Sequence, residues 1–395
     1  SILNLNVATV GAINGVTTNG GTINLSSTGG IFVGKNIDTG SGSGNLNVNT
    51  TNSQFSQAAS TSVKAGALSI TVGTGSVTLN EPANDFATVQ VTSAGAVNLR
   101  DVNTVTLSGI NAASFDLVAG GNVINSFGST NTTGNFSVLA TTGNISVGEG
   151  VTAGGDMSLQ ASSGNIALSG SLVKKAVGNV SFQAGATNGL LAVNSPVEST
   201  SGNVVYVADN VTLADMTTAI AVGKSIEIKP VTASTVIEFL SDGDGPALMR
   251  LSSSEMNSLT TPLLKIGNIA NTGGILISEV VSPPNVTSLS LVTSGTITQP
   301  TAGATRTSPN LNAHGMAGVS LNLANNVSGN LAGRTGSAAF SFNNDTNSIS
   351  VGLVDVVNNG IISDSGGVIT LTSTLGSVST TGSGIIKTAG TLNAR

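Results

Sequence analysis

The stretch Gly134-Asn135-Phe136-Ser137-Val138 occurs again, with small changes, through the middle of this chain. Each copy is a Gly followed by Asn or Asp, and then by alternating apolar and small polar residues. The copies form two interleaved sets, and within each set they recur roughly every 22 residues, a period typical of solenoid repeats. One period therefore carries two turn-plus-strand units. Further copies begin at Gly143, Gly155, Gly164, Gly178 and Gly202.

Alternation of apolar and polar residues predicts strands rather than helices. It is plain in Ser76-Val77-Thr78-Leu79-Asn80 and again in Val319-Ser320-Leu321-Asn322-Leu323, and a period of two over four to six residues indicates a half-buried strand. Stacking such strands coil upon coil buries their apolar side and pairs each backbone with the next. We therefore predict an all-β, right-handed parallel β-helix, with the hand taken from the crossover rule for parallel strands.

The size of the repeat sets the expected number of coils. Dividing the 395 residues by about 22 gives roughly 18 coils. A propeller is the structural competitor, but its repeats of about 40 residues usually carry aromatic signatures that this sequence lacks. The same composition runs from end to end, so we expect one continuous solenoid over residues 1–395.

The composition is poor in charge and in aromatic residues. Only 8% of residues are charged and 3% are aromatic, Cys and Trp are absent, and the net charge is −6. Nucleic-acid binding needs clustered Lys and Arg, whereas Lys174-Lys175 is the one adjacent basic pair. No apolar stretch is long enough for a membrane-spanning helix. Nucleic acid is therefore not an expected partner, and the chain is not expected to span a membrane.

Residues 227–265 interrupt the pattern. Charge density rises there and the alternation lapses, so we expect an irregular excursion from the coils. Ser252-Ser253-Ser254-Glu255 has the spacing of a capping box, and Met256 and Leu259 follow it. This arrangement predicts one short helix near 252–259.

These residues together resemble a known family. The Gly-Asn-apolar-Ser-apolar units look like the β-helical repeat region of filamentous-haemagglutinin-like bacterial exoproteins and adhesins. Ser254–Leu259, Leu263–Gly267, Gly274–Ser278 and Val319–Val327 are similar in style to phrases of those surface proteins. The resemblance covers nearly the whole chain, although the family's Asn-Pro-Asn secretion signature has no match. It implies a β-helix at the cell surface or outside the cell.

Catalytic and metal-binding constellations are sparse. Asp242 and Asp244, in Asp242-Gly243-Asp244-Gly245, form the one close acidic pair outside a clear strand and are the candidate metal ligands, with a polar turn as the plainer interpretation. His314 is the only imidazole, and no Gly-x-Ser-x-Gly elbow accompanies it. We therefore predict no catalytic residues and no cofactor.

Asn residues at the start of strands have two interpretations. Asn135, Asn144, Asn179 and Asn210 each begin an Asn-x-Ser/Thr sequon, which the strand pattern generates by itself. Stacked Asn side chains could instead form a hydrogen-bonded ladder along the coil axis, and we favour that role. Among the aromatic residues, Phe136, Phe182, Phe340 and Phe342 fall at strand positions that favour the core, while the alternation leaves the face of Tyr206 open.

Both ends of the sequence carry the repeat pattern and offer no capping helix. We expect axial stacking surfaces there, so that the chain associates head to tail or continues in a longer polypeptide. The residues concerned are Ile2, Leu3, Leu5, Ile385, Ile386 and Leu392.

The expected function is a non-catalytic, extracellular structural or adhesive β-solenoid that forms or belongs to a surface fibre. Glycans or a neighbouring cell surface are the expected targets of an adhesive version. Two alternatives stay open: a β-helix protein that binds or cleaves polysaccharide, and a passive stalk that presents a separate binding tip.

Overall fold

The computed structural model describes residues 4–11, 13–40, 43–185, 187–214, 219–221, 224–240, 248–300, 307–355 and 358–395. They fall into two compact units. Unit 1 comprises Ser1–Gly185 and Asn194–Pro196, and unit 2 comprises Ala186–Val193 and Val197–Arg395.

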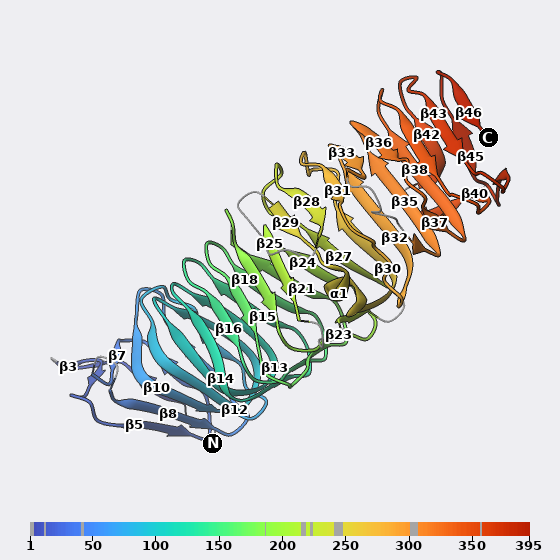
Figure 1. The fold of residues 1–395 in the computed structure, drawn as a ribbon. Coiled ribbons are helices and arrows are strands. Elements are labelled where there is room, and N and C mark those ends of the chain that lie inside the picture. The colour runs from blue at the N-terminus through green and yellow to red at the C-terminus, as the bar shows by residue number, and fades with distance from the viewer. Residues whose placement is uncertain are drawn as a thin grey trace. The chain divides into compact units, whose positions relative to one another are not determined.

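Within each unit the strands stack in parallel as successive coils (Figure 1). Over the described residues the coils number about 16, and the fold is almost entirely β with one short helix. The predicted all-β, parallel β-solenoid is confirmed, while its right-handed sense stays a prediction. The coils are fewer than the roughly 18 predicted from a period of about 22 residues because some are longer. Register partners such as Ile226 and Leu264 lie much further apart in sequence than one such period.

The strands of unit 1 are β1 (Leu5–Val7), β2 (Thr9–Val10), β3 (Ile13–Asn14), β4 (Val16–Thr17), β5 (Ile23–Ser27), β6 (Ile31–Val33), β7 (Ile37–Asp38), β8 (Asn45–Thr50), β9 (Phe55–Gln57), β10 (Val63–Thr71), β11 (Val77–Leu79), β12 (Asp85–Asp101), β13 (Val105–Ala119), β14 (Val123–Thr132), β15 (Phe136–Ala140), β16 (Ile145–Val147), β17 (Val151–Ala153), β18 (Met157–Ala161), β19 (Ile166–Leu168), β20 (Lys174–Ala176) and β21 (Val180–Ala184).

The elements of unit 2 are β22 (Leu190–Val193), β23 (Val197–Ser199), β24 (Val204–Val207), β25 (Asn210–Leu213), β26 (Ala219–Ala221), β27 (Ser225–Lys229), β28 (Val236–Phe239), β29 (Leu248–Arg250), α1 (Ser253–Asn257), β30 (Leu259–Gly267), β31 (Ile275–Ile277), β32 (Val286–Thr293), β33 (Thr296–Thr298), β34 (Thr307–Ser308), β35 (Asn310–Gly315), β36 (Gly318–Leu321), β37 (Asn326–Val327), β38 (Asn330–Thr335), β39 (Phe340–Asn343), β40 (Ile349–Val351), β41 (Leu353–Asp355), β42 (Asn358–Ser363), β43 (Ile369–Thr372), β44 (Val378–Thr380), β45 (Ile385–Lys387) and β46 (Leu392–Ala394).

Each coil in the middle of unit 1 contains three strands. β15, β16 and β17 form one coil, and they pair in parallel with β18, β19 and β20 of the next. The sequence predicted only two strand units per period. The third strand escaped notice because no Gly-Asn pair precedes β17 or β20, whereas one precedes the equally short β16 and β19.

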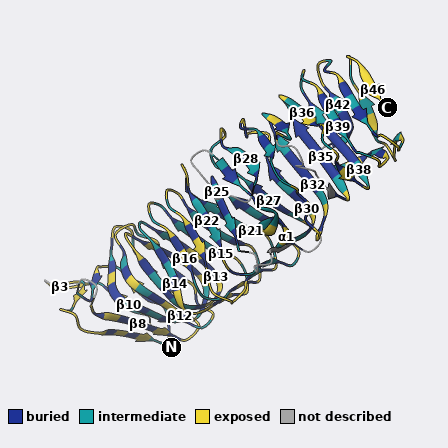
Figure 2. Ribbon diagram, viewed as in Figure 1, coloured by how far each residue is buried: buried dark blue, intermediate teal, exposed yellow. Residues whose placement is uncertain are grey.

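The core consists of the inward half of each alternating strand (Figure 2). Phe115 and Phe136 are register partners in consecutive coils, and their rings stack with centroids 5.6 Å apart and an interplanar angle of 15°. The predicted core position of Phe136, Phe182, Phe340 and Phe342 is confirmed, because all four are buried. Tyr206, whose face the sequence left open, is also fully buried.

The recurrent Asn residues connect neighbouring coils through their side chains. Asn122 Oδ1 accepts the backbone N–H of Asn144 at 2.8 Å, and Asn144 Oδ1 accepts that of Asn165 at 2.8 Å. A second row has the same form, with Asn135 Oδ1 accepting from Asp156 at 2.9 Å and Asp156 Oδ1 accepting from Asn179 at 2.6 Å. The predicted ladder is therefore confirmed in unit 1.

Unit 2 contains the same contact, for example at Asn310, and a variant of it at Asn210. Asn310 Oδ1 accepts the N–H of Asn330 at 2.8 Å. The Asn210 side chain instead donates to the carbonyl oxygen of Asn188 at 3.3 Å. In both cases the amide side chain joins two coils.

The ladder also explains the Gly that precedes the Asn or Asp in the second row. A Cβ added to Gly155 would collide with Oδ1 of Asn135 in the preceding coil, and one added to Gly178 would collide with Oδ1 of Asp156. The side chain of one coil thus occupies the space above the glycine of the next. Gly-Asn is a single stacking unit in which the Gly makes room and the Asn makes the bond.

The predicted helix is present as α1. Ser252 is its N-cap, the Ser252 hydroxyl accepts from the Glu255 N–H, and Glu255 Oε2 accepts from the Ser252 N–H at 2.8 Å. Met256 is buried against the coil. In addition, Glu255 Oε1 accepts the Leu213 N–H at 2.9 Å, which ties the helix to β25.

We predict that Gly155→Ala destabilises the protein by roughly 1–3 kcal/mol, because the new methyl group overpacks the site of the Asn135 side chain. Gly148→Ala is the matched control, since a Cβ there meets its nearest atom at an ordinary 3.6 Å. We expect the control to change stability by less than about 1 kcal/mol. Urea unfolding followed by circular dichroism measures both variants. Equal destabilisation by the two would contradict the stacking role of the glycine.

Candidate functional site

The acidic pair proposed as metal ligands, Asp242 and Asp244, lies outside the described residues. Within the described part of the chain, no group of three or more His, Cys, Asp or Glu side chains is placed to hold a metal ion.

Only some of the residues expected at the axial stacking surfaces lie within the described part of the chain. Ile2 and Leu3 lie outside the described residues, whereas Leu5 pairs in register with Ile31 of the next coil. At the other end, Ile386 pairs with Ile361 and Leu392 with Ile369, and Ile385 lies beside Ile386 in β45.

Two buried ionisable side chains of unit 1 stabilise the coils through hydrogen bonds to backbone groups. Asp101, at the end of β12, accepts the Phe86 N–H at 2.6 Å through Oδ2 and the Asn103 N–H at 2.9 Å through Oδ1. Burial raises the pKa of Asp101 to about 6, although these two hydrogen bonds oppose the rise. Lys174 donates to the carbonyl oxygens of Ser169 at 2.7 Å and Leu172 at 3.0 Å, and burial lowers its pKa to about 8. The hydrogen bonds of both charged side chains are therefore made to the backbone.

The principal polar site of unit 2 lies where a hairpin covers the outer side of the coils. β41 pairs with β42 in antiparallel register, while β42 pairs in parallel with β38. β41 also lies against β32 and β35. Outward-facing side chains of these two strands are therefore buried under the hairpin, although outward positions elsewhere are solvated. The buried polar residues are Ser290, Asn312 and His314, which alternate with the core residues Leu289, Leu291, Leu311 and Ala313.

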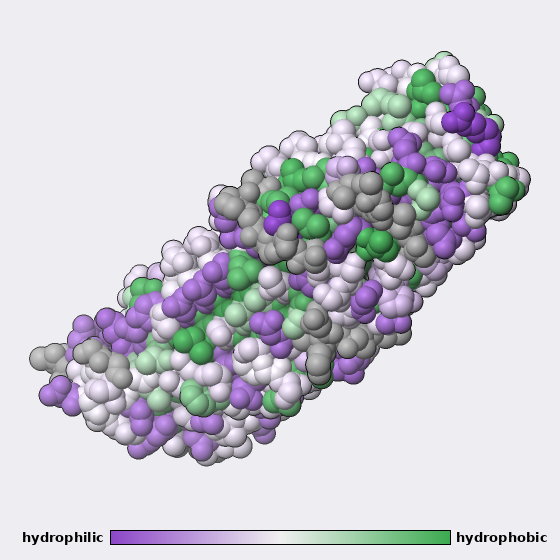
Figure 3. Space-filling view, in the orientation of Figure 1, coloured by the Kyte–Doolittle hydropathy of each residue, from purple (hydrophilic) through white to green (hydrophobic). Residues whose placement is uncertain are grey.

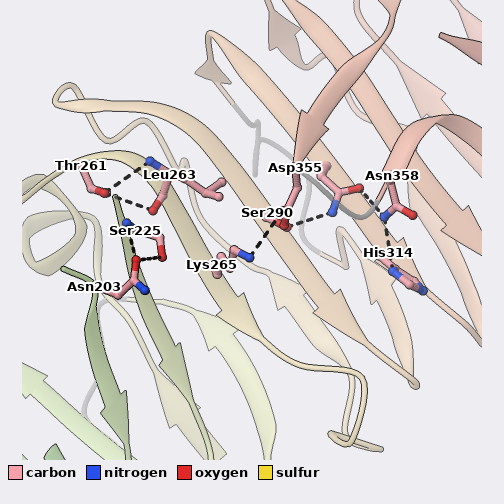
Figure 4. A network of polar contacts seen from close by, with 10 residues as sticks. Asn203, Ser225, Thr261, Leu263, Lys265, Ser290, His314, Asp355 and Asn358 are labelled. Atoms are coloured by element: carbon pink, nitrogen blue, oxygen red, sulfur yellow. Dashed lines mark hydrogen bonds and ion pairs between the residues drawn. The ribbon is translucent and has the colours of Figure 1, made fainter. Parts of the chain in front are cut away.

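A continuous chain of hydrogen bonds runs through this site (Figure 4). The Ser290 hydroxyl donates to Asp355 Oδ2 at 3.0 Å, and Asn312 Nδ2 donates to Ser290 Oγ at 2.8 Å. Asn358 Nδ2 donates to Asn312 Oδ1 at 3.0 Å and contacts His314 Nδ1 at 3.3 Å. The chain thus connects the hairpin residue Asp355 to the imidazole through three intervening side chains.

An ion pair lies at one end of the chain. Lys265 Nζ is 3.4 Å from Asp355 Oδ1, a separation longer than a strong charge-assisted hydrogen bond. Asp355 is buried, and its Oδ1 makes no hydrogen bond within the described residues. Asn358 Oδ1 is likewise buried and unbonded there. Two acceptor oxygens at the hairpin are therefore incompletely satisfied.

The hydrogen bonds determine the form of His314. Because the amide nitrogen of Asn358 can only donate, Nδ1 of the imidazole is the acceptor and Nε2 carries the proton. Nε2 lies 3.4 Å from Met316 Sδ. Burial lowers the pKa of His314 below its usual value, and the Arg334 guanidinium adds to that effect, while Asp364 and Asp355 oppose it. The imidazole is accordingly neutral at pH 7.

A cavity of about 340 Å³ adjoins this cluster. Glu227, Lys265, Asn312, His314, Asp355 and Asn358 contribute polar groups to its wall, and Gly267, Ile269 and Val292 contribute apolar surface. This volume is at the lower end of the range for small-molecule sites in proteins. The cavity could hold a small ligand.

Ser290 and His314 do not form a nucleophile–base pair. Ser290 Oγ donates to Asp355, and Asn312 and Asn358 separate it from His314. Nucleophilic catalysis requires the hydroxyl and the base to share a hydrogen bond. In this geometry the polar groups position the hairpin.

Sequence reasoning missed this site. It considered His314 only as a member of a triad, and it did not single out Lys265, Ser290, Asn312, Asp355 or Asn358. These residues come from four separate coils, and Lys265 and Asp355 are 90 positions apart. The one local signal is Asn310-Leu311-Asn312-Ala313-His314, where larger polar groups replace the usual Ser and Thr at outward positions.

Comparisons of the chain with protein-family models, with curated proteins and with solved structures find no match. The fold nevertheless defines the class, which is that of parallel β-solenoids built from β-helical repeats. No helix among the described residues is long and apolar enough to cross a membrane.

We predict that acidification from pH 7 to pH 4 increases the stability of the wild type relative to Asp101→Asn. The folded-state pKa of Asp101 is raised to about 6 from 3.8, so the folded protein binds the proton more tightly than the unfolded chain. The stabilisation is present below pH 4 and is lost as the pH rises through 6. We expect a difference of roughly 1–3 kcal/mol between the two pH values. Denaturant titrations measure it, and parallel pH profiles for the two proteins would contradict the assignment.

We predict that Asp355→Ala costs roughly 1–3 kcal/mol of stability, because it removes the acceptor of Ser290 and the partner of Lys265. Asp364→Ala is the control. Its ion pair with Arg334, at 2.9 Å, is between partly exposed side chains and is worth about 0–1 kcal/mol. Hydrogen exchange of residues 352–355 and 358–363 measures the two strands of the hairpin directly. An effect of Asp364→Ala as large as that of Asp355→Ala would argue against the special role of the covered cluster.

Proposed function

We propose that this protein is a non-catalytic structural β-solenoid that forms or belongs to an extracellular surface fibre. The observation that carries this proposal is the stacking ladder. In each ladder row the outward Asn and Asp side chains bind the backbone of the next coil, so the recurrent motif of the sequence serves coil-on-coil association. The extracellular location rests on the resemblance of the repeats to those of bacterial exoproteins.

The outer surface supports the same proposal. Figure 3 shows hydrophilic, neutral and hydrophobic side chains interspersed on the face that it draws. The sequence supplies Ser, Thr, Asn and Gly at most outward positions, with few charges. Such a surface suits a body whose working property is its length and regular repeat.

The coil formed by β44, β45 and β46 offers a surface for further stacking. Leu392 continues the inward register of Ile369, yet Leu392 is 47% exposed and Ile369 is fully buried. In the described residues these three strands pair with β40, β42 and β43 on one side only. Unpaired strand edges and apolar side chains favour the addition of strands. The next coil would come from a longer polypeptide or from a second copy.

A second candidate function is favoured by one observation. The cavity beside the hairpin combines an apolar wall with Lys265, Glu227 and amide groups, a composition common in ligand sites. Binding of a small ligand, including a saccharide unit, is therefore the alternative to a purely structural role.

The proposal is tested by comparing the wild type with Leu392→Glu. Negative-stain electron microscopy and light scattering should show head-to-tail assemblies of the wild type at high concentration, and Leu392→Glu should reduce their amount at least tenfold, because a charge would be buried at the junction. Asn393→Glu is the control, since residue 393 is the outward neighbour in the same strand. A wild type that stays monomeric at all concentrations contradicts the homopolymer, and turnover of a polysaccharide by the pure protein contradicts the non-catalytic role.

A further inference from the structure

The hydrogen-bond chain under the β41–β42 hairpin has a fixed direction. Both N–H groups of the Asn358 amide point away from Asp355, one to Asn312 Oδ1 and one to His314 Nδ1. The Asn312 amide then donates to Ser290, and the single hydroxyl proton of Ser290 is left for Asp355. This direction matches the Nε2–H tautomer of the neutral imidazole, in which Nδ1 is the acceptor.

Protonation of His314 conflicts with this direction. A protonated Nδ1 becomes a donor and would face the donor amide of Asn358. Rotation of the Asn358 amide relieves the clash, since Asn358 Oδ1, which has no partner in the described residues, can then accept from the imidazolium. Asn312 must rotate as well, so that its nitrogen donates to Asn358 Oδ1 and its oxygen accepts from Ser290. The Ser290 proton is then no longer available to Asp355.

We propose that the β41–β42 hairpin is an acid-sensitive latch, in which protonation of His314 reverses the hydrogen-bond chain and releases Asp355 from Ser290. Asp355 then keeps only the long contact of 3.4 Å to Lys265. The Asn358 Nδ2 group takes the buried place of Oδ1 and lacks an acceptor there. Acidification therefore removes one hydrogen bond from the hairpin and leaves a buried donor unsatisfied, which favours the open form.

The charged groups around His314 set how strongly the latch responds. Arg334 is the register partner of His314 on β38 and opposes protonation, while Asp364, which pairs with Arg334 at 2.9 Å, moderates that effect. Asp355 faces the imidazole from β41 and favours protonation. Lys265 on β30 and Glu227 on β27 line the same cavity with opposite charges. The closed hairpin disfavours the charged imidazole, because burial and Arg334 outweigh the two carboxylates.

The effect of pH on closing of the hairpin has an upper limit. Suppose that His314 has the ordinary pKa of 6.5 when the hairpin is open and binds no proton when it is closed. The equilibrium constant for closing the hairpin then falls about 30-fold between pH 8 and pH 5. The closing free energy is fully present above pH 6.5 and declines as the pH falls below that value. Proton binding by the closed form makes the change smaller.

The proposal is tested on the full chain by nitrogen-detected NMR of its single histidine together with hydrogen exchange. At pH 7 the imidazole should be the neutral Nε2–H tautomer. Between pH 7 and pH 5 the protection of residues 352–355 and 358–363, corrected for the intrinsic pH dependence of exchange, should fall by a factor of about 3 to about 25. Residues 369–372 of β43 serve as the internal reference, because that strand contains no ionisable residue.

Two variants distinguish the proposed latch from a general loss of stability at low pH. His314→Gln offers a neutral acceptor that does not titrate, so the protection of residues 352–355 and 358–363 should stay constant over this pH range. Asn358→Asp places a carboxylate beside the imidazole and raises the pKa of His314 in the closed form, so the loss of protection on acidification should be weakened or reversed. An Nδ1–H tautomer at pH 7, or equal loss of protection in the wild type and His314→Gln, would overturn the proposal.

Discussion

The structure depends on one recurring constraint, the backbone N–H group at the start of a strand that needs an acceptor in the preceding coil. The outward Asn or Asp of that coil supplies it, as Asn144 does for Asn165. At several of these contacts the residue above must lack a side chain, because a Cβ at Gly155 or Gly178 would occupy the space of the acceptor oxygen. Recurrence of Gly-Asn is therefore a steric requirement together with a hydrogen-bonding one, and it keeps successive coils in register.

Inward positions follow a simpler rule. The alternation sends Val, Ile, Leu and Phe into the coil, where they stack on their equivalents, as Phe115 does on Phe136. Burial of these apolar side chains stabilises each coil against its neighbours. Because every coil repeats the same contacts, a solenoid of this kind gains stability mainly from nearest neighbours.

The hairpin of unit 2 shows how the same pattern acquires a different property. Ser290, Asn312 and His314 occupy outward positions that would be solvated on an uncovered coil. The hairpin removes water from them, so each must find its partner among the others and in Asp355 and Asn358. A buried polar network of this type is sensitive to the protonation of any member, and the proposed latch follows from that sensitivity. The structural function proposed for the chain does not require it.

The sequence by itself determined the parallel β-solenoid, the role of stacked Asn side chains as connectors between coils, the capping box of α1 and the core position of four Phe residues. Each of these is a local or periodic property, which a period of two and a repeat of about 22 residues express directly. It misjudged the number of coils and of strands per coil, since long connections and the three-residue strands β17 and β20 carry no signature of their own. Only the tertiary structure decided that Lys265, Ser290, Asn312, His314, Asp355 and Asn358 form one cluster. Their proximity results from the register of four coils and from the hairpin that covers them, and neither is encoded in the spacing of any short stretch.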